Sequence, residues 1–313
     1  MLRLSFIVPF YNVELYIEEC LRSLYNQDVP QEEYEVICVD DCSPDGSRAI
    51  VERLQKEYPT LKLLIHMENK RQGGARNTGM KVAQGRYVWF VDADDYILPN
   101  CLKELLDHAE REQLDILRIY YSENGKKAQG MICYGPCSGS ELIFDAPMHL
   151  TPAQRCSYVC AGLISRALLI DNKIWFTEHV QYEDDDYAYL FYAYAKKAQI
   201  VPITAYIVRE RMESTTRNTY SFQTIEYLVL QVRRIIEKEK VLKPIDGRWT
   251  DLINHSVSWT CSEQILKHLR ELPQENVLRF YLKGMGRIPR LRNFVSRRVW
   301  WAMTSLICYK LLY

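Results

Sequence analysis

The first third of the chain alternates short apolar runs with amphipathic segments, and this alternation restricts the fold more than any other feature of its 313 residues. The apolar runs predict strands over residues 4–8, 34–39, 61–66 and 87–91. The segments between them repeat apolar side chains at helical spacing and predict helices over residues 14–26, 47–58 and 75–83. Continuous apolar strands that alternate with helices form a parallel sheet covered on both faces. The sequence therefore predicts an α/β fold built on a mostly parallel sheet flanked by helices.

The rest of the chain is mixed at first and then mainly helical. The pattern predicts, in chain order, a helix, a strand, a loop or hairpin, a helix and a longer helical stretch over residues 100–112, 115–121, 122–140, 184–196 and 222–268. We expect three regions: an α/β domain over 1–217, a helical C-terminal region over 218–285, and a basic, aromatic tail over 286–313.

The tail is the most basic part of a chain whose formal net charge is zero, because eight Lys and Arg residues and no acidic residue follow Glu275. Apolar side chains recur at spacings of three and four from Leu291 to Leu306 and predict an amphipathic helix. Trp300 and Trp301 are residues that settle at the level of lipid headgroups. The helix is therefore predicted either to lie on an anionic membrane surface or to pack on the protein. Nucleic acid is not an expected partner.

The cysteines and the apolar runs bear on the compartment. Ten cysteines are present, and the pairs Cys133/Cys137 and Cys156/Cys160 have a spacing that zinc sites sometimes use, but reduced thiols are the simpler interpretation. The first apolar stretch is too short for a signal peptide, and no stretch is long enough to span a membrane. We expect a cytoplasmic protein, peripheral on the cytoplasmic face of the inner membrane if the tail binds lipid.

An acidic run, Asp92-Ala93-Asp94-Asp95, follows the strand predicted over residues 87–91. Residues i and i+2 of an extended chain point the same way, so Asp92 and Asp94 are expected to face one point beyond the sheet. Carboxylate oxygens suit Mg²⁺ or Mn²⁺, ions that stabilise a diphosphate leaving group. The alternative is a solvated acidic turn, or a helix cap by Asp94.

Two further motifs are predicted at the same edge of the sheet. Asp40 and Asp41 end the strand over 34–39 and offer carboxylates to a nucleobase or a ribose, or else cap the loop that follows. Gly73 and Gly74 precede a helix whose first N–H groups suit an anion, with Arg76 adding positive charge. An ordinary glycine-rich helix start is the alternative.

Four consecutive carboxylates begin at Glu183 and continue with Asp184. Their mutual repulsion favours the protonated form of one member, so that one of them suits a general base. The alternative is the preference of acidic residues for a helix N-terminus.

Taken together, six segments resemble the inverting bacterial glycosyltransferases of family 2, over roughly residues 3–217. They read Ile-Val-Pro-Phe-Tyr-Asn at 7–12, Cys-Leu-Arg-Ser-Leu-Tyr-Asn-Gln at 20–27, Val-Asp-Asp-Cys-Ser-Pro-Asp-Gly-Ser at 39–47, Gly-Ala-Arg-Asn-Thr-Gly at 74–79 with 85–95 after it, Leu-Ile-Ser-Arg at 163–166, and Tyr-Glu-Asp at 182–184. The resemblance implies the Rossmann-like GT-A fold. Cys42 and Glu213 depart from the pattern, since each stands where glycine is usual.

The resemblance also implies a role for each matching residue. Those expected to hold the nucleoside are Pro9, Tyr11 and Asp41, with Asp40 near. Asp92 would touch the ribose or the waters of the metal, and Asp94 would bind the metal, Mn²⁺ or Mg²⁺. Asp184, beside Glu183, would be the catalytic base. Arg209 and Arg211 would clamp the diphosphate.

The function expected from these residues is transfer of a hexose or N-acetylhexosamine from a nucleoside-diphosphate sugar, with UDP the expected nucleotide. The expected acceptor is a saccharide or lipid-linked hydroxyl, in polysaccharide, lipopolysaccharide or glycolipid assembly. A metal-dependent phosphohydrolase or nucleotidyltransferase is an alternative, although the first strand lacks the D-x-D-x-[TV] of one phosphatase class and no glycine-rich loop with a lysine is present. A non-catalytic scaffold that binds membrane or nucleic acid is the other alternative.

Overall fold

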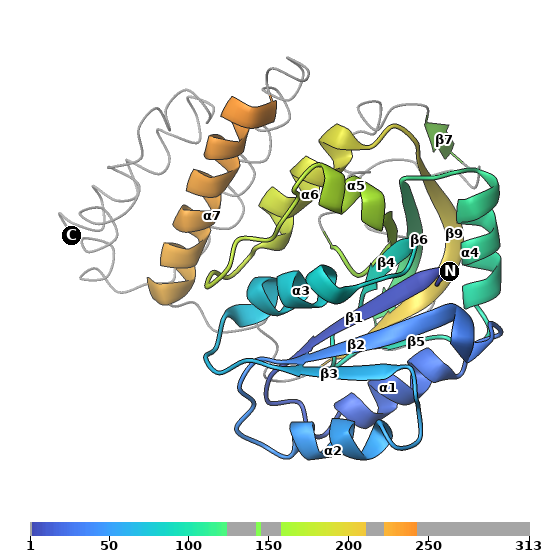
Figure 1. Ribbon diagram of the computed structural model, residues 1–313. Coiled ribbons are helices and arrows are strands. Elements are labelled where there is room, and N and C mark those ends of the chain that lie inside the picture. Colours follow the sequence, from blue (N-terminus) through green and yellow to red (C-terminus); the bar gives the residue numbers. More distant parts are fainter. Residues whose placement is uncertain (1, 124–141, 145–157, 211–221, 243–313) are drawn as a thin grey trace. The chain divides into compact units, whose positions relative to one another are not determined.

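The computed structural model describes residues 2–123, 142–144, 158–210 and 222–242 (Figure 1). The chain divides into two compact units, Met1–Arg211 and Met212–Tyr313. The boundary expected after residue 217, the tail over 286–313, Arg211 and nearly all of the segment 122–140 lie outside the described residues.

The first unit is built on one sheet, to which the described residues contribute nine strands. They are β1 (Leu4–Phe10), β2 (Tyr34–Asp40), β3 (Leu61–Ile65), β4 (Tyr87–Phe90), β5 (Tyr96–Ile97), β6 (Ile116–Glu123), β7 (Leu142–Phe144), β8 (Gly162–Ser165) and β9 (Ala198–Val208). Their order is β3-β2-β1-β4-β8-β6-β9-β5, with β7 paired to β9. The pairings among β3, β2, β1 and β4 are parallel, whereas β8 is antiparallel to both of its neighbours.

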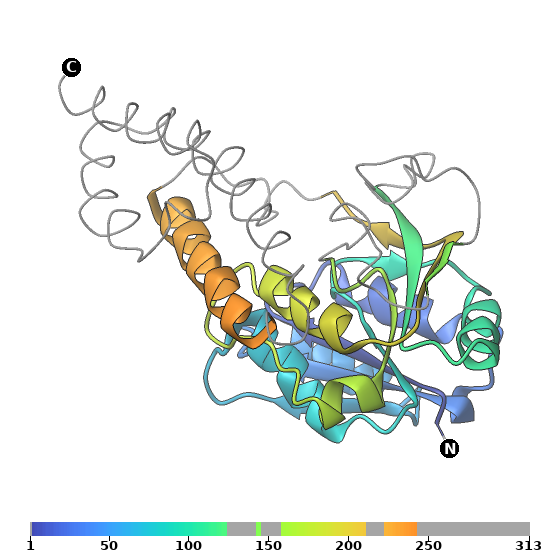
Figure 2. The same cartoon turned by 90° about the horizontal axis from the view of Figure 1, so that it is seen from above.

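Helices cover both faces of this sheet (Figures 1 and 2). Their bounds are α1 (Ile17–Tyr25), α2 (Ser47–Leu54), α3 (Arg71–Val82), α4 (Leu102–Arg111), α5 (Arg166–Asp171) and α6 (Asp184–Tyr194), with a short 3₁₀ turn, η1 (Gln31–Glu33). The helices α1 and α2 lie on one face, and α3, α5 and α6 lie on the other (Figure 1). The helix between β2 and β3, α2, and the helix between β3 and β4, α3, lie on opposite faces of the sheet. The strand order therefore runs outward from β1 in both directions, through β2 and β3 on one side and from β4 on the other, and it reverses between β1 and β4. Ligands of open α/β sheets bind beyond the carboxyl ends of strands at such a point.

The predicted alternation of strands and helices is confirmed from β1 to β4. Every residue of β1, β2 and β4 is buried. Phe6, Tyr34 and Trp89 pack together there, with the Phe6 ring centroid 5.8 Å from that of Tyr34 and 5.6 Å from that of Trp89. Such uninterrupted burial is expected of parallel strands covered on both faces.

Two features differ from the sequence prediction. Helix α3 begins at Arg71 rather than residue 75, so Gly73 and Gly74 lie within its first turn. A Cβ on Gly73 would come within 2.6 Å of the Thr177 carbonyl oxygen, so the glycine permits close packing against the segment before α6. The strands β8 and β9 were not predicted, although β9 pairs with three other strands and positions part of the site.

The described part of the second unit is one helix, α7 (Phe222–Leu242). Leu228, Gln231, Val232 and Ile235 are buried along one side of it, at the three- and four-residue spacing of a helical face. This confirms the start of the helical stretch predicted over 222–268. Within the described residues, no helix has the length and apolar character needed to cross a membrane.

Replacing Gly162 by alanine should destabilise the first unit. Gly162 has a φ of +136°, a backbone conformation that residues other than glycine rarely adopt. A Cβ there would lie 2.0 Å from the Leu117 carbonyl oxygen on the paired strand. We expect a loss of roughly 3 kcal/mol in the free energy of unfolding, from backbone strain and overpacking. Urea denaturation measures it.

The matched control is Gly46→Ala, where a Cβ would meet the end of the flexible Glu14 side chain. A loss no larger for Gly162→Ala than for this control would contradict the assigned register of β8.

Candidate active site

The motifs predicted at the sheet edge do lie at the carboxyl ends of neighbouring strands. Pro9 is buried at the end of β1, and Tyr11 follows it with half of its surface exposed. Asp40 ends the adjacent β2 and Asp41 follows it, and Asp92 comes two residues after β4, on the other side of β1. The order β2-β1-β4 therefore gathers three motifs that are separated by about 30 to 50 residues in the sequence.

Protein groups hold the first acidic pair in place. Asp40 accepts hydrogen bonds from Arg48 Nε at 2.5 Å and from the Ser43 N–H at 2.8 Å. Asp41 Oδ1 accepts one from the Lys70 N–H at 2.8 Å and lies 2.7 Å from His66 Nδ1. Both carboxylates are buried. Asp40 therefore caps the loop that follows β2, as the capping interpretation predicted. The Asp41 carboxylate is held by His66 and the Lys70 N–H instead, so its orientation is fixed before any ligand binds.

Cys42, one of the two departures from the family pattern, has a φ of +67°. That is the left-handed region in which glycine carries no steric penalty. The cysteine thus adopts a backbone conformation suited to the usual glycine, and its Sγ lies 3.1 Å from the His66 carbonyl oxygen.

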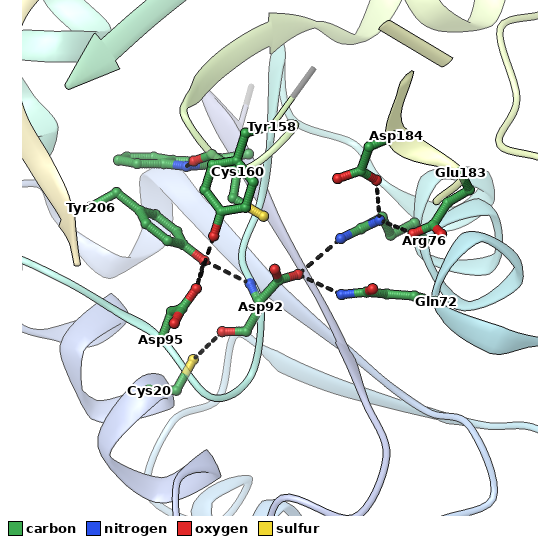
Figure 3. Close-up of polar contacts among 11 residues, drawn as sticks. Cys20, Gln72, Arg76, Asp92, Asp95, Tyr158, Cys160, Glu183, Asp184 and Tyr206 are labelled. Atoms are coloured by element: carbon green, nitrogen blue, oxygen red, sulfur yellow. Dashed lines mark hydrogen bonds and ion pairs between the residues drawn. The ribbon is translucent and has the colours of Figure 1, made fainter. Parts of the chain in front are cut away.

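Asp92 lies at the centre of the site (Figure 3). Its Oδ1 accepts hydrogen bonds from Arg76 Nη2 at 2.9 Å and Gln72 Nε2 at 2.7 Å, both on α3. Its N–H donates to the Tyr206 hydroxyl at 3.0 Å. The carboxylate is therefore held from the α3 side, and the backbone is held from β9.

Arg76 connects Asp92 to the second acidic motif. Its Nη1 donates to Glu183 Oε1 at 2.6 Å and to Asp184 Oδ1 at 2.8 Å. The residue is only 1% exposed and stacks over Phe176, 5.2 Å from the ring centroid. Burial by itself would lower the pKa of Arg76, but the charges of Asp184, Asp92 and Glu183 raise it well above its ordinary value. Arg76 is therefore a fixed cation among three carboxylates.

Glu183 and Asp184 differ in accessibility although they are adjacent. Helix α6 begins at Asp184. This agrees with the preference of acidic residues for helix N-termini. The Glu183 side chain is 6% exposed and the Asp184 side chain is 27% exposed. An acceptor hydroxyl can therefore approach Asp184 more readily than Glu183.

Asp95 forms a second buried network, on the side of Asp92 opposite to Arg76 and Gln72 (Figure 3). Its Oδ2 accepts hydrogen bonds from the hydroxyls of Tyr206 at 2.8 Å and Tyr158 at 3.0 Å, and its Oδ1 accepts one from the Arg209 N–H at 2.8 Å. Burial, reinforced by the charges of Asp92 and Asp94, raises the pKa of Asp95 to about 8, because these effects outweigh the hydrogen bonds.

This raised pKa predicts a pH-dependent stability of the metal-free protein. Above its ordinary pKa of 3.8, Asp95 loses its proton in the unfolded state but keeps it in the folded state up to about 8. The folded state thus binds more protons, and its stability should fall as pH rises between these values. Asp95→Asn should make that fall shallower, as measured by urea denaturation at several pH values. An unchanged slope would show that Asp95 is already ionised in the folded protein.

Arg209 contacts the acidic loop but is also engaged elsewhere. Its Nε donates to the Asp94 carbonyl oxygen at 3.0 Å, and its Nη2 lies 2.8 Å from Glu19 Oε2. The guanidinium also stacks over the rings of Tyr16 and Tyr96. It therefore lies beside the Asp92–Asp95 loop, where a phosphate clamp would be expected, and that role stays a prediction.

The residues present fit a divalent cation that is completed by a substrate. Among the described residues, no group of three His, Cys, Asp or Glu side chains has the arrangement of a protein-only metal site. Mg²⁺ and similar ions are commonly held by one or two carboxylates together with substrate phosphates. Within the part of the chain that the structure describes, the two hydrogen bonds to the Asp92 carboxylate fall on Oδ1. Residues 92–95 form a turn closed by the Asp95 N–H and the Asp92 carbonyl oxygen at 3.0 Å, not the extended chain expected from the sequence, and Asp94 is half-buried within it.

Sequence reasoning missed several residues of this site. Tyr206, Tyr158 and His66 were not singled out, and Gln72, at the start of the glycine-rich motif, was given no role. The one available signal was for Gln72, which lies one helical turn before Arg76 and so shares its face. The tyrosines carried no signal, because the strand that brings Tyr206 to the site was not predicted.

Known proteins resemble this chain in sequence and in fold. The family model described as Glycosyl transferase family 2 matches residues 5–138. EpsJ, an uncharacterized glycosyltransferase of Bacillus subtilis, is 31% identical over 234 residues, which cover 72% of this chain and 67% of that protein. The poly(ribitol-phosphate) beta-glucosyltransferase of Bacillus spizizenii is 33% identical over 201 residues, which cover 64% of this chain. The match covers only 30% of that longer protein.

A solved structure has the same fold. Residues 1–349 of TarS from Staphylococcus aureus, in complex with UDP-GlcNAc, superpose with a TM-score of 0.72 at 23% identity, covering 99% of this chain and 89% of that one. The similarity confirms the GT-A fold expected from the sequence.

Proposed function

Because the chain belongs to glycosyltransferase family 2, we propose that it transfers a sugar from a nucleoside-diphosphate sugar to an acceptor hydroxyl, with inversion at the anomeric carbon. The observation that carries the proposal is the meeting of Asp92, Glu183 and Asp184 around Arg76 at the carboxyl ends of the strands. This meeting joins the motif expected to bind the donor to the motif expected to activate the acceptor, as a direct displacement requires.

The donor occupies the edge formed by β1, β2 and β4. Tyr11 offers an exposed ring against which a nucleobase stacks, and Asp41 is held in a single orientation to accept a hydrogen bond from it. The UDP-GlcNAc named in the TarS complex supports UDP as the nucleotide. Asp94, with Asp92 beside it, would hold Mn²⁺ or Mg²⁺. That ion, when bound, neutralises charge on the departing diphosphate.

Asp184 is the group that takes the proton from the acceptor. It is an accessible carboxylate, its Oδ1 is held by Arg76, and the neighbouring Glu183 is too buried to share the task. The acceptor oxygen attacks the anomeric carbon as its proton passes to Asp184, and the bond to the diphosphate oxygen breaks. Glu183 serves to hold Arg76.

The acceptor is proposed to be a hydroxyl of a surface polysaccharide or a lipid-linked saccharide. The polymer in the name of the Bacillus spizizenii relative supports this class. The match covers less than a third of that relative, so its particular substrate is not carried over. The membrane role of the tail over 286–313 stays a prediction. Comparing binding of the full chain and of a truncation after Arg287 to anionic vesicles at low and high salt tests it.

The test of the function is a panel of nucleotide sugars with Mn²⁺ or Mg²⁺ present. Binding is followed by thermal shift, because a ligand that binds only the folded state raises the melting temperature. Transfer is followed by release of the nucleoside diphosphate with candidate saccharide acceptors. We expect a UDP-sugar to stabilise the protein and to be consumed only when acceptor is added. Stabilisation by no nucleotide sugar would contradict the proposal.

A further inference from the structure

Arg76 is the only residue in the described part of the chain that bonds to carboxylates of both acidic motifs. One terminal nitrogen, Nη2, faces Asp92 after β4. The other, Nη1, faces Glu183 and Asp184 at the start of α6. These partners lie 16, 107 and 108 residues away in the sequence, so a single side chain links two segments that the backbone does not connect locally.

The burial of Arg76 argues against a role as a phosphate ligand. A residue that is 1% exposed, with its guanidinium stacked on Phe176, presents almost no surface to a donor. Its terminal nitrogens are already within 2.9 Å of three carboxylate oxygens. If Arg76 moved away to bind a diphosphate, the negative charges of those carboxylates would no longer be compensated, which is costly in a buried site.

Starting from the proposed transferase function, the geometry points to Arg76 as a positioning residue that fixes the acceptor base Asp184 relative to the donor-side carboxylate Asp92. The planar guanidinium sets the separation of the two carboxylates, since both accept from nitrogens of one rigid group. The anomeric carbon and the acceptor oxygen then meet at a fixed distance. A displacement of about 1 Å from such a geometry costs on the order of 10²-fold in rate.

Gln72 provides the matched control. It lies on the same helix one turn earlier and donates to the same oxygen, Asp92 Oδ1, at 2.7 Å. No hydrogen bond joins it to Glu183 or Asp184 among the contacts of the described residues. Gln72→Leu therefore loosens Asp92 alone, whereas Arg76→Lys keeps the charge but loses the fork that spans both motifs.

The experiment measures kcat and the donor KM for wild type, Arg76→Lys, Gln72→Leu, Asp184→Asn and the double variant of Arg76→Lys with Asp184→Asn. We expect Arg76→Lys to lower kcat by on the order of 10²-fold and to raise donor KM no more than Gln72→Leu does, since both residues donate to Asp92 Oδ1. Gln72→Leu should mainly raise donor KM. In the Asp184→Asn background, Arg76→Lys should cost almost nothing further, because its effect passes through Asp184.

A second variant covers the case in which Arg76→Lys does not fold. Arg76→Met combined with Glu183→Gln removes one cation and one anion together, and should keep donor-induced thermal stabilisation while losing turnover. The inference would be overturned, and the proposed function left standing, by a raised donor KM with unchanged kcat in either Arg76 variant. Full additivity of Arg76→Lys with Asp184→Asn would have the same consequence. Absence of transfer by the wild type with every donor would overturn the proposed function, and the inference with it.

Discussion

Asp184→Asn should abolish sugar transfer and leave donor binding almost unchanged. The asparagine keeps the shape and still accepts a hydrogen bond from Arg76 Nη1, now 2.8 Å from Asp184 Oδ1. It cannot take the proton of the acceptor. Because a general base acts mainly in the transition state, we expect kcat to fall by about 10²–10⁴-fold.

Steady-state kinetics with saturating acceptor, together with donor binding by thermal shift, separate the two effects. Asp171→Asn is the control, since Asp171 is an exposed carboxylate at the end of α5, outside the site, and its loss should change neither quantity. Transfer by Asp184→Asn at the wild-type rate would move the role of the base to a neighbouring carboxylate of the same run.

Asp94→Asn should remove the dependence on metal together with most of the activity. If Asp94 holds the ion that neutralises the departing diphosphate, its loss forfeits several kcal/mol of transition-state stabilisation, or on the order of 10³-fold in rate. An excess of chelator should reduce wild-type turnover to a similar level, and added Mn²⁺ should restore the wild type but not the variant.

A readout independent of activity accompanies this prediction. Mn²⁺ added with UDP should raise the melting temperature of the wild type, since both bind only the folded state, and should raise that of Asp94→Asn much less. The melting temperatures of the two proteins without ligand should be close, because Asp94 is half-buried and at the surface of the site. Full wild-type activity in excess chelator would rule out the metal.

The two predictions with the largest effects concern residues that the sequence already singled out. They could be singled out because each stands beside a strand or helix that is recognisable from its own short segment of sequence. Asp94 follows a strand whose apolar run is visible in the sequence, and Asp184 begins a helix that is visible in the same way. The apolar runs and the helical spacing of these elements are local patterns, so periodicity locates the elements, although it placed the start of α3 four residues too late. The alternation of β1 to β4 with α1 to α3 could be predicted on the same basis.

The contacts within the site could not be predicted in this way. Glu183 and Asp184 are neighbours of similar chemistry, and only the packing of α3 against the start of α6 buries the first more than the second. Tyr206 reaches Asp95 because β9 pairs with β5 in antiparallel fashion, a pairing between segments about 110 residues apart that leaves no local pattern.

The sequence by itself determined the α/β alternation and the acidic residues at its strand ends, because burial on both faces and strand termination are properties of short segments. Only the tertiary structure decided that Arg76 lies among three carboxylates. Its partners are brought to it by the order β2-β1-β4 and by the return of the chain to α6. A charged side chain takes its role from the charges that surround it, and the order of strands and the packing of helices determine which charges those are.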